Sequence, residues 1–181
     1  MSQTNVKEAL MKTISGIQAN PAMSNVVFRA DTEWLEDVRC TARVRDFDPL
    51  FIDEPPELGG KDSAVNPVEL VLVALGTCQE IMYSAYASVM DIPLDSVKVN
   101  ARGYLDLKGL FGLDPEVPAG YKRITFETHI ESPADDDSLR KLIETVESHC
   151  PVLDILARAQ AVKGSAKVNG RELHSLQTSA A

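Results

Sequence analysis

One segment constrains the fold of this chain more than any other. Asn66-Pro67-Val68-Glu69 has the composition of a helix start, with a capping side chain, a first-turn proline and a glutamate that can complete a capping box. The residues that follow are apolar on nearly every side until Asp91-Ile92-Pro93, which predicts a helix over residues 67–90. A helix without a polar face must be buried in a core or at a subunit interface. A membrane span is the rival interpretation, but it would place Gln79 and Glu80 near the bilayer centre at a large free-energy cost, so we expect no membrane partner.

The rest of the chain alternates between extended and helical patterns. Residues 39–45 and 97–108 alternate polar and apolar side chains with a period of two, which predicts half-buried strands. Residues 124–130 follow the same pattern, so we expect them to form an antiparallel hairpin with 97–108. The other segments predict an amphipathic helix at 5–19, a connecting loop at 54–62, a helix at 137–149, a short helix from Pro151 and a last strand at 160–168. This order indicates an α+β protein.

We divide the chain into three parts. Residues 1–24 form a helical arm, residues 25–170 form the main domain, and residues 171–181 form a tail without regular structure. The apolar stripe of the arm can pack on the body of its own subunit or on a partner subunit, and the sequence favours neither.

Composition narrows the possible functions. The chain has 18 basic and 27 acidic residues and a net charge of −9, which repels phosphate backbones, so we expect no nucleic-acid partner. Three cysteines without a short repeated spacing are not a secreted disulfide framework, and the charged N-terminal residues leave no signal-peptide core. We therefore expect a cytoplasmic protein. No nicotinamide or flavin fingerprint and no common zinc-ligand spacing is present, so we expect no cofactor and no metal.

Two cysteines stand where chemistry can use them. Cys150 precedes Pro151, and because proline favours the first position of a helix, Cys150 is predicted to be the N-cap, with its sulfur near free N–H groups. Cys78 lies in the middle of the long helix, where we expect no helix end to reach it, so its activation needs a cation. One face of the strand at 39–45 offers the nearest candidates: Arg39, Arg43 and Arg45.

The third cysteine, Cys40, lies on the other face of that strand, beside Ala42 and Val44. Free cysteine is among the most buried residue types, so Cys40 is predicted to be an inert core thiol.

Four segments also carry a family resemblance: Asp53-Glu54-Pro55-Pro56-Glu57-Leu58-Gly59-Gly60, Asn66-Pro67-Val68-Glu69-Leu70, Ala74-Leu75-Gly76-Thr77-Cys78 and Cys150-Pro151. Over about residues 25–170 the chain resembles the OsmC/Ohr family. This resemblance implies an intertwined homodimer, in which two long central helices cross and six-stranded antiparallel sheets wrap around them. It also implies a thiol peroxidase, in which Cys78 attacks the peroxide and Cys150 is the resolving thiol.

The resemblance also bears on how Cys78 is activated. Well-known hydroperoxide reductases of the family carry a glutamate directly after the Asn-Pro pair, and it orients a catalytic arginine. This chain has Val68 there, and Glu69 follows about 100° further round the helix. We expect Arg39 or Arg45 to activate Cys78, with Glu69 assisting.

The expected activity is the reduction of organic hydroperoxides, with an external dithiol as the reductant. The loop with Leu110-Phe111 is either a flap over an apolar substrate pocket or a loop tucked on the core. The alternative function is a non-enzymatic dimer that binds an apolar small molecule in a stress response, which the missing glutamate favours. The thiol mechanism requires Cys78 and Cys150 to approach, because a disulfide needs Cα atoms about 4.4–6.8 Å apart.

Overall fold

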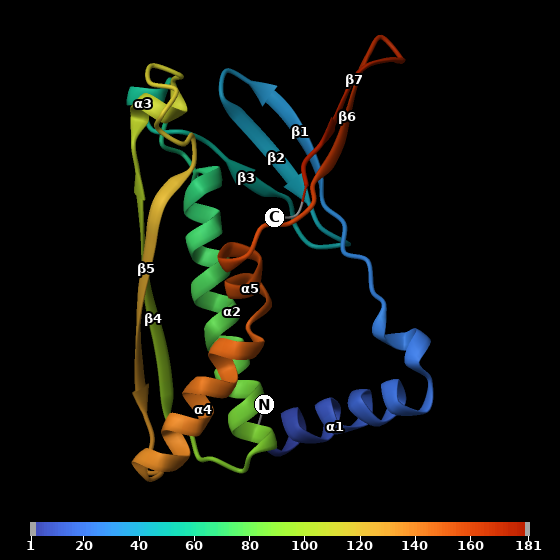
Figure 1. The fold of residues 1–181 in the computed structure, drawn as a ribbon, viewed down its shortest axis with the longest axis vertical. Helices are drawn as coiled ribbons and strands as arrows, with labels where there is room; N and C mark the ends of the chain where they lie inside the picture. The colour runs from blue at the N-terminus through green and yellow to red at the C-terminus, as the bar shows by residue number, and fades with distance from the viewer. Residues whose placement is uncertain (1–2, 180–181) are drawn as a thin grey trace.

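The computed structural model describes residues 3–179, and it has the expected α+β class (Figure 1). The helices are α1 (Gln3–Ala19), α2 (Pro67–Val89), α3 (Leu107–Leu110), α4 (Asp136–His149) and α5 (Pro151–Ala157), with short 3₁₀ turns η1 (Pro21–Ser24) and η2 (Pro56–Leu58). The strands form three antiparallel sheets: β1 (Asp31–Glu36), β2 (Arg39–Arg43) and β3 (Leu50–Ile52); β4 (Ser96–Leu105) and β5 (Tyr121–Glu131); β6 (Lys163–Val168) and β7 (Arg171–Gln177). The predicted dimer and its six-stranded sheets concern two chains and stay predictions.

The long helix α2 forms where its capping residues predicted it. The side chain of Asn66 accepts the N–H of Glu69 at 2.8 Å, and the carboxylate of Glu69 accepts the N–H of Asn66 at 2.9 Å. At the other end, Asp91 adopts a left-handed backbone with φ of 56°, and the N–H of Ile92 returns to a carbonyl of the last turn at 2.9 Å. Both ends of the helix are therefore fixed by local bonds.

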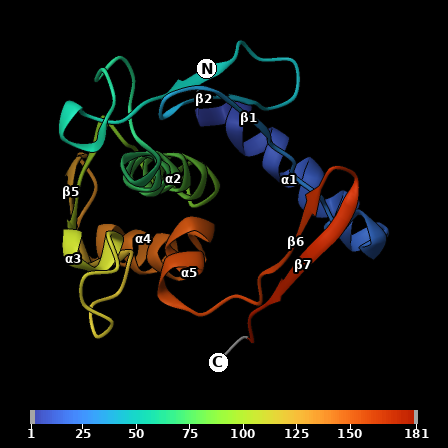
Figure 2. The ribbon, with the colours of Figure 1, turned by 90° about the horizontal axis from the view of Figure 1, so that it is seen from above.

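One stripe of α2 makes the core. Its buried side chains recur every fourth residue: Leu75, Gln79, Tyr83 and Ala87. The hairpin β4–β5 lies along one side of α2 and α4–α5 along another (Figures 1 and 2). Leu142 and Val146 of α4 pack against Tyr83 there. A further side of α2 has no cover in this chain, since Ile81 is 66% exposed, so the expected burial of α2 on all sides is not reached within one chain.

By length and hydropathy α2 also qualifies as a membrane span, among the helices of residues 3–179. This is weak evidence, because the core helix of a soluble protein passes the same test. Glu80, near the middle of α2, accepts the backbone N–H of Val99 at 3.1 Å, so this acidic group is committed to a contact within the protein.

The predicted hairpin forms between β4 and β5, in register from the pair Ser96 and Glu131 onward. Its first strand ends at Leu105, earlier than predicted, because the carboxylate of Asp106 caps the short helix α3 by accepting the N–H of Lys108 at 3.1 Å. The segment Leu110-Phe111 is exposed, in α3 and the turn after it, at one end of the β4–β5 hairpin (Figure 1).

The C-terminal segment differs from the prediction. Residues 171–181 were expected to lack regular structure, but Arg171–Gln177 forms β7 and pairs with β6. The reason is the turn Asn169-Gly170, in which both residues have positive φ, 51° and 79°, as hairpin turns of this composition require. Residues 180–181 lie outside the described part.

The N-terminal arm contains the expected helix. Within the predicted arm of residues 1–24, α1 and η1 occupy most of residues 3–24, and residues 1–2 are outside the described range. The arm packs mainly on the C-terminal end of α2.

Candidate active site

The two predicted redox cysteines meet in the fold. The sulfur atoms of Cys78 and Cys150 lie 3.5 Å apart. Cys150 is 1% exposed and Cys78 is partly buried, and both are free thiols. A disulfide would close this distance to about 2.05 Å, a small movement for two side chains in contact. The expected approach of the two thiols is confirmed, and their chemical roles stay predictions.

The break between α4 and α5 places Cys150. The helix α4 ends at His149, and α5 begins with Pro151 at its first position. A residue before proline is disfavoured in the helical region, and Cys150 has the extended backbone, φ −72° and ψ 112°, that follows. Cys150 is therefore the N-cap of α5, as predicted.

The N-terminal end of α5 acts on Cys78 and not on Cys150. The side chain of Cys150 makes no capping bond. Instead, the backbone N–H of Val152 bonds the sulfur of Cys78 and acts to lower its pKa. Two expectations are therefore wrong: the free N–H groups do not face Cys150, and a helix end does reach Cys78. The cause is tertiary, because α2 crosses the start of α5.

The net effect of the surroundings is to raise the pKa of Cys78. Burial is the largest cause, and it disfavours the thiolate. The N–H of Val152 opposes this, whereas the neighbouring thiol of Cys150 raises the pKa further. The groups of this one chain therefore favour the protonated thiol, and activation needs a cation.

The predicted arginines are not beside Cys78 in this chain. Arg39 lies with its guanidinium carbon 5.1 Å from the ring centre of Phe51, and its Nε is buried without a hydrogen-bond partner. Arg45, just after β2, lies 4.5 Å from the ring centre of Phe47. Neither is among the groups that shift the pKa of Cys78. Their role stays a prediction, and so does the source of the cation.

Glu69 is occupied at the start of α2. Its carboxylate completes the capping box with Asn66. Its charge also helps to raise the pKa of Tyr121, after the larger effect of burial, and the hydroxyl of Tyr121 donates to the carbonyl of Val68 at 2.9 Å. Nine residues of helix, about 13.5 Å, separate Glu69 from Cys78.

Cys40 lies in the β1–β2–β3 sheet, whereas Cys78 lies on α2 and Cys150 is the N-cap of α5. It is half-buried in β2, opposite Trp34 of β1 and Ile52 of β3, and is less enclosed than the predicted core thiol. Across residues 3–179, no group of three or more His, Cys, Asp or Glu side chains is placed to hold a metal ion.

A pocket with a mixed apolar and polar lining lies close to the two helices that meet at the cysteine pair. Its volume is about 310 Å³, and it lies between α2, β5 and α5. Its lining includes Leu75, Ile124, Phe126, Leu153 and Leu156, together with Tyr121, Lys122 and Arg123. Leu75 lies three residues before Cys78 and Leu153 three residues after Cys150, so the same two helices serve the pocket and the thiols, although neither cysteine is among the lining residues. The predicted segment Leu110-Phe111 is not part of its lining. Two patterns in the sequence pointed to the walls of this pocket: the inward-facing apolar residues of 124–130 and the apolar run after Pro151.

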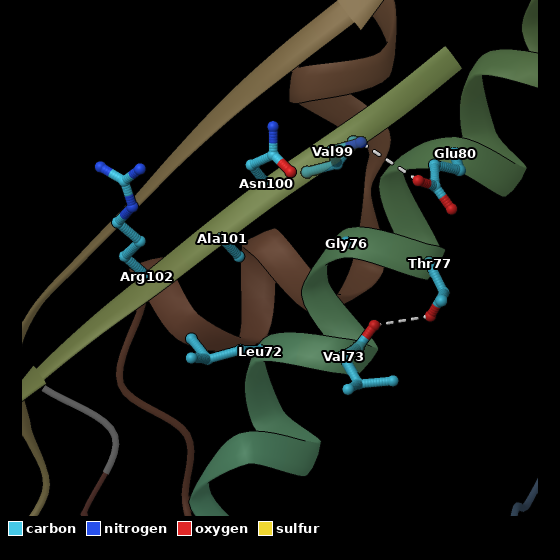
Figure 3. A pocket seen from close by; sticks show the side chains of 9 residues that line it. All are labelled: Leu72, Val73, Gly76, Thr77, Glu80, Val99, Asn100, Ala101 and Arg102. Atoms are coloured by element: carbon cyan, nitrogen blue, oxygen red, sulfur yellow. Dashed lines mark hydrogen bonds between the residues drawn. The ribbon is translucent and has the colours of Figure 1, made fainter. Parts of the chain in front are cut away.

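A larger groove runs between α2 and β4 (Figure 3). Its volume is about 620 Å³, and Gly76, Glu80 and Ala101 are among its lining residues. Glu80 is two residues from Cys78, about 200° round the helix, so the groove lies on the opposite flank of α2 from the thiols. The groove follows the edge of β4 that pairs with no strand within residues 3–179.

The fold and the site together define an α+β protein with two free thiols in contact, one on a long helix and one before a proline-started helix. The profile of the OsmC-like protein family matches residues 60–164 of this chain. The chain belongs to the OsmC-like protein family.

Several relatives are similar over most of the chain. The hydroperoxide reductase of Mycoplasma genitalium is 25% identical over 128 residues, which cover 69% of this chain and 84% of that protein. The crystal structure of an OsmC-like protein from Mycoplasma pneumoniae is 19% identical and has a TM-score of 0.63, covering 74% of this chain and 89% of that one. An organic hydroperoxide resistance protein from Legionella pneumophila is 21% identical with a TM-score of 0.56, covering 73% and 91%. The two solved structures establish the shared fold.

Proposed function

We propose that this protein is a thiol-dependent peroxidase that reduces organic hydroperoxides, with Cys78 as the attacking thiol and Cys150 as the resolving thiol. The observation that carries the proposal is the contact of the two sulfur atoms at 3.5 Å, with the thiol of Cys150 buried. Membership of the OsmC-like family and the likeness to a hydroperoxide reductase support a role with peroxides.

The proposed chemistry balances with two thiols and one external reductant. The thiolate of Cys78 attacks a peroxide oxygen, an S–O bond forms as the O–O bond breaks, and the alkoxide leaves as an alcohol after taking a proton. The sulfenic acid of Cys78 then condenses with the thiol of Cys150, which forms the disulfide and releases water. An external dithiol reduces this disulfide by two thiol–disulfide exchanges and becomes a disulfide itself. A reducing cytoplasm suits that cycle, and it uses no cofactor.

The pocket beside the thiols supports the class of substrate. The aliphatic and aromatic part of its lining favours an alkyl or aryl group by removing apolar surface from water, whereas hydrogen peroxide gains nothing from that part. The pocket volume, about 310 Å³, suits a ligand the size of cumene hydroperoxide.

A homodimer is the second part of the proposal. Within one chain, α2 leaves Ile81 exposed, and the outer edge of β4 pairs with no strand among the described residues. A second copy can cover both, which is the arrangement of crossed helices and six-stranded sheets. The same partner is the source we propose for the activating arginine, Arg39 or Arg45, since neither reaches Cys78 from its own chain.

The test is peroxide-dependent consumption of dithiothreitol with cumene hydroperoxide. The wild type should turn over, Cys78→Ser should lose activity completely, and Cys40→Ser, the matched control, should keep it. Equal rates in wild type and Cys78→Ser would overturn the peroxidase proposal.

The raised pKa of Cys78 favours a second candidate, a dimer that binds an apolar small molecule without chemistry. In that case neither the wild type nor any of these variants consumes thiol. An apolar fluorescent probe should nevertheless bind at the pocket, and Leu153→Arg should abolish that binding.

A further inference from the structure

The first helix carries an apolar stripe that residues 3–179 cover only in part. The stripe consists of Val6, Leu10, Met11, Ile14 and Ile17. No residue of α1 is buried, and Met11 and Ile14, in its second half, are exposed. An isolated amphipathic helix of this length is marginal in water, so the stripe needs a packing partner.

The beginning of α1 is held by polar contacts with the end of α2. The side-chain amide of Gln3 donates to the carbonyl of Ile92 at 3.0 Å, and Lys7 forms an ion pair with Asp91. Both contacts are at the C-terminal end of α2. From there α1 runs outward, away from α2 (Figures 1 and 2). The contacts orient the helix, but they leave Met11 and Ile14 of the stripe exposed.

The segment after α1 also exposes apolar side chains that lack a packing partner among the described residues. Residues 25–30 are extended without strand pairing, and Val27 and Phe28 are 80% and 90% exposed. Within residues 3–179 no segment covers these two side chains, so a second molecule is a natural source of cover.

The distribution of charge along the chain indicates which kind of molecule covers the arm. Residues 1–30 carry three basic side chains and one acidic one, whereas the other 151 residues carry 15 basic and 26 acidic side chains. The arm is therefore positive and the body strongly negative, which favours docking of the arm on a body of the same kind. The body also offers apolar surface of its own, at Ile81 of α2. A closed dimer needs such complementary surfaces within one sequence.

We propose that residues 3–30 form an exchanged arm, in which the apolar stripe of α1 packs on the body of a second copy of this chain. This proposal rests on the homodimer of the proposed function, and the exchanged arm adds a further contact between its two chains. It lies outside residues 60–164, which match the family profile, so it is a feature of this chain beyond the shared domain.

The test is photo-crosslinking of the purified full-length protein. A benzoylphenylalanine is placed at Ile14 of the stripe or, as the matched control, at Lys12, about 160° away round the helix. The exchanged arm predicts a covalent dimer from Ile14 at least several-fold above that from Lys12, and a yield that falls as salt rises. Peptide mapping should place the Ile14 crosslink on residues beyond 30.

Sedimentation separates the arm from the dimer. A protein that sediments as a dimer but gives no intermolecular crosslink from Ile14 overturns the exchanged arm and leaves the homodimer intact. A protein that sediments as a monomer overturns both. Deletion of residues 1–24 gives a second readout: the exchanged arm predicts at least a tenfold weaker dimer, and an unchanged dimer dissociation constant contradicts it.

Discussion

The sulfur of Cys150 lies 3.5 Å from the sulfur of Cys78, although 72 positions separate the two residues. The contact exists because α2 crosses the junction of α4 and α5, where Pro151 ends one helix and begins the next. The same crossing directs the N–H of Val152 to Cys78. A second thiol and an N–H donor that acts on the sulfur of Cys78 therefore come from one short segment.

This contact predicts a specific oxidation product. One equivalent of cumene hydroperoxide should produce an intramolecular Cys78–Cys150 disulfide, seen by mass spectrometry as one linked peptide pair, while Cys40 remains open to alkylation. Because Cys150→Ser removes the resolving thiol, that variant should stop at a sulfenic acid on Cys78 that dimedone labels. A disulfide that includes Cys40, or one that links two chains, would contradict the assignment.

The neighbouring thiol also affects how readily Cys78 ionises. Burial and Cys150 raise the pKa of Cys78, so Cys150→Ala should lower it and speed alkylation of Cys78 by iodoacetamide at pH 7. The measurement is the alkylation rate of Cys78 against pH, with Cys40→Ala as the control that should leave the profile unchanged. If the profile of Cys150→Ala coincides with that of the wild type, the second thiol has no such effect.

The arginine that we propose a second copy supplies should have the opposite effect on this profile. Since a nearby guanidinium stabilises the thiolate, Arg39→Ala or Arg45→Ala should move the alkylation pKa of Cys78 upward, by about one unit or more for a close pair. Arg43→Ala, on the same strand, is the matched control. Identical profiles in all three variants would remove the arginine from the mechanism.

The sequence predicted what local chemistry determines. Asn66, Pro67 and Glu69 act within one turn, so the start of α2 could be predicted from them to the residue. Cys150 as the N-cap of α5 was predictable for the same reason, because Pro151 follows it directly. Asn169-Gly170 carried an equally local hairpin signal for β7.

The rest depends on how distant segments pack. No pattern along the chain joins Cys78 to Cys150, and the family resemblance was the only reason to pair them. Which sulfur the N–H of Val152 meets follows from the crossing of α2 over α5, which a one-dimensional pattern does not contain. In the proposed homodimer the position of Arg39 relative to Cys78 would depend on a second chain as well, which neither the sequence nor one subunit determines.

A close approach inside the β4–β5 hairpin predicts a stability difference between two glycines. A Cβ atom added at Gly103 would lie 2.3 Å from the ring of Tyr121, whereas one added at Gly76 would meet Val99 at an ordinary 3.9 Å. Gly103→Ala should therefore lower the free energy of unfolding by about 1–3 kcal/mol, as overpacking does. Gly76→Ala should raise it by up to about 1 kcal/mol, because alanine is the better helix former.

Urea denaturation of Gly103→Ala and Gly76→Ala measures the difference in the free energy of unfolding. The cause is tested by repeating Gly103→Ala in a protein that also carries Tyr121→Leu. In a Tyr121→Leu protein the ring is gone, so the added cost of Gly103→Ala should largely disappear. An equal cost in both backgrounds would show that the ring of Tyr121 is not what the new methyl group meets.

The carboxylate of Asp53 predicts a stability that depends on pH. Asp53 is 2% exposed, and it accepts the hydroxyl of Ser63 at 2.7 Å and the N–H groups of Ser63, Glu54 and Lys61 at 3.1, 2.9 and 3.2 Å. The hydroxyl of Ser63 is the largest cause that lowers the pKa of Asp53 to about 2. These bonds hold the loop after β3 in place, ahead of α2.

Because the folded-state pKa is below the unfolded value of about 3.9, the charged carboxylate stabilises the fold fully above that value, and the contribution is lost as the pH falls through about 2. Asp53→Asn should therefore have a lower urea midpoint than the wild type at pH 7, and the gap should narrow between about pH 4 and pH 2. Glu57→Gln, an exposed carboxylate of the same loop, should show no such gap. A gap for Asp53→Asn that stays constant down to pH 2.5 would mean that the variant acts through packing and not through the charge.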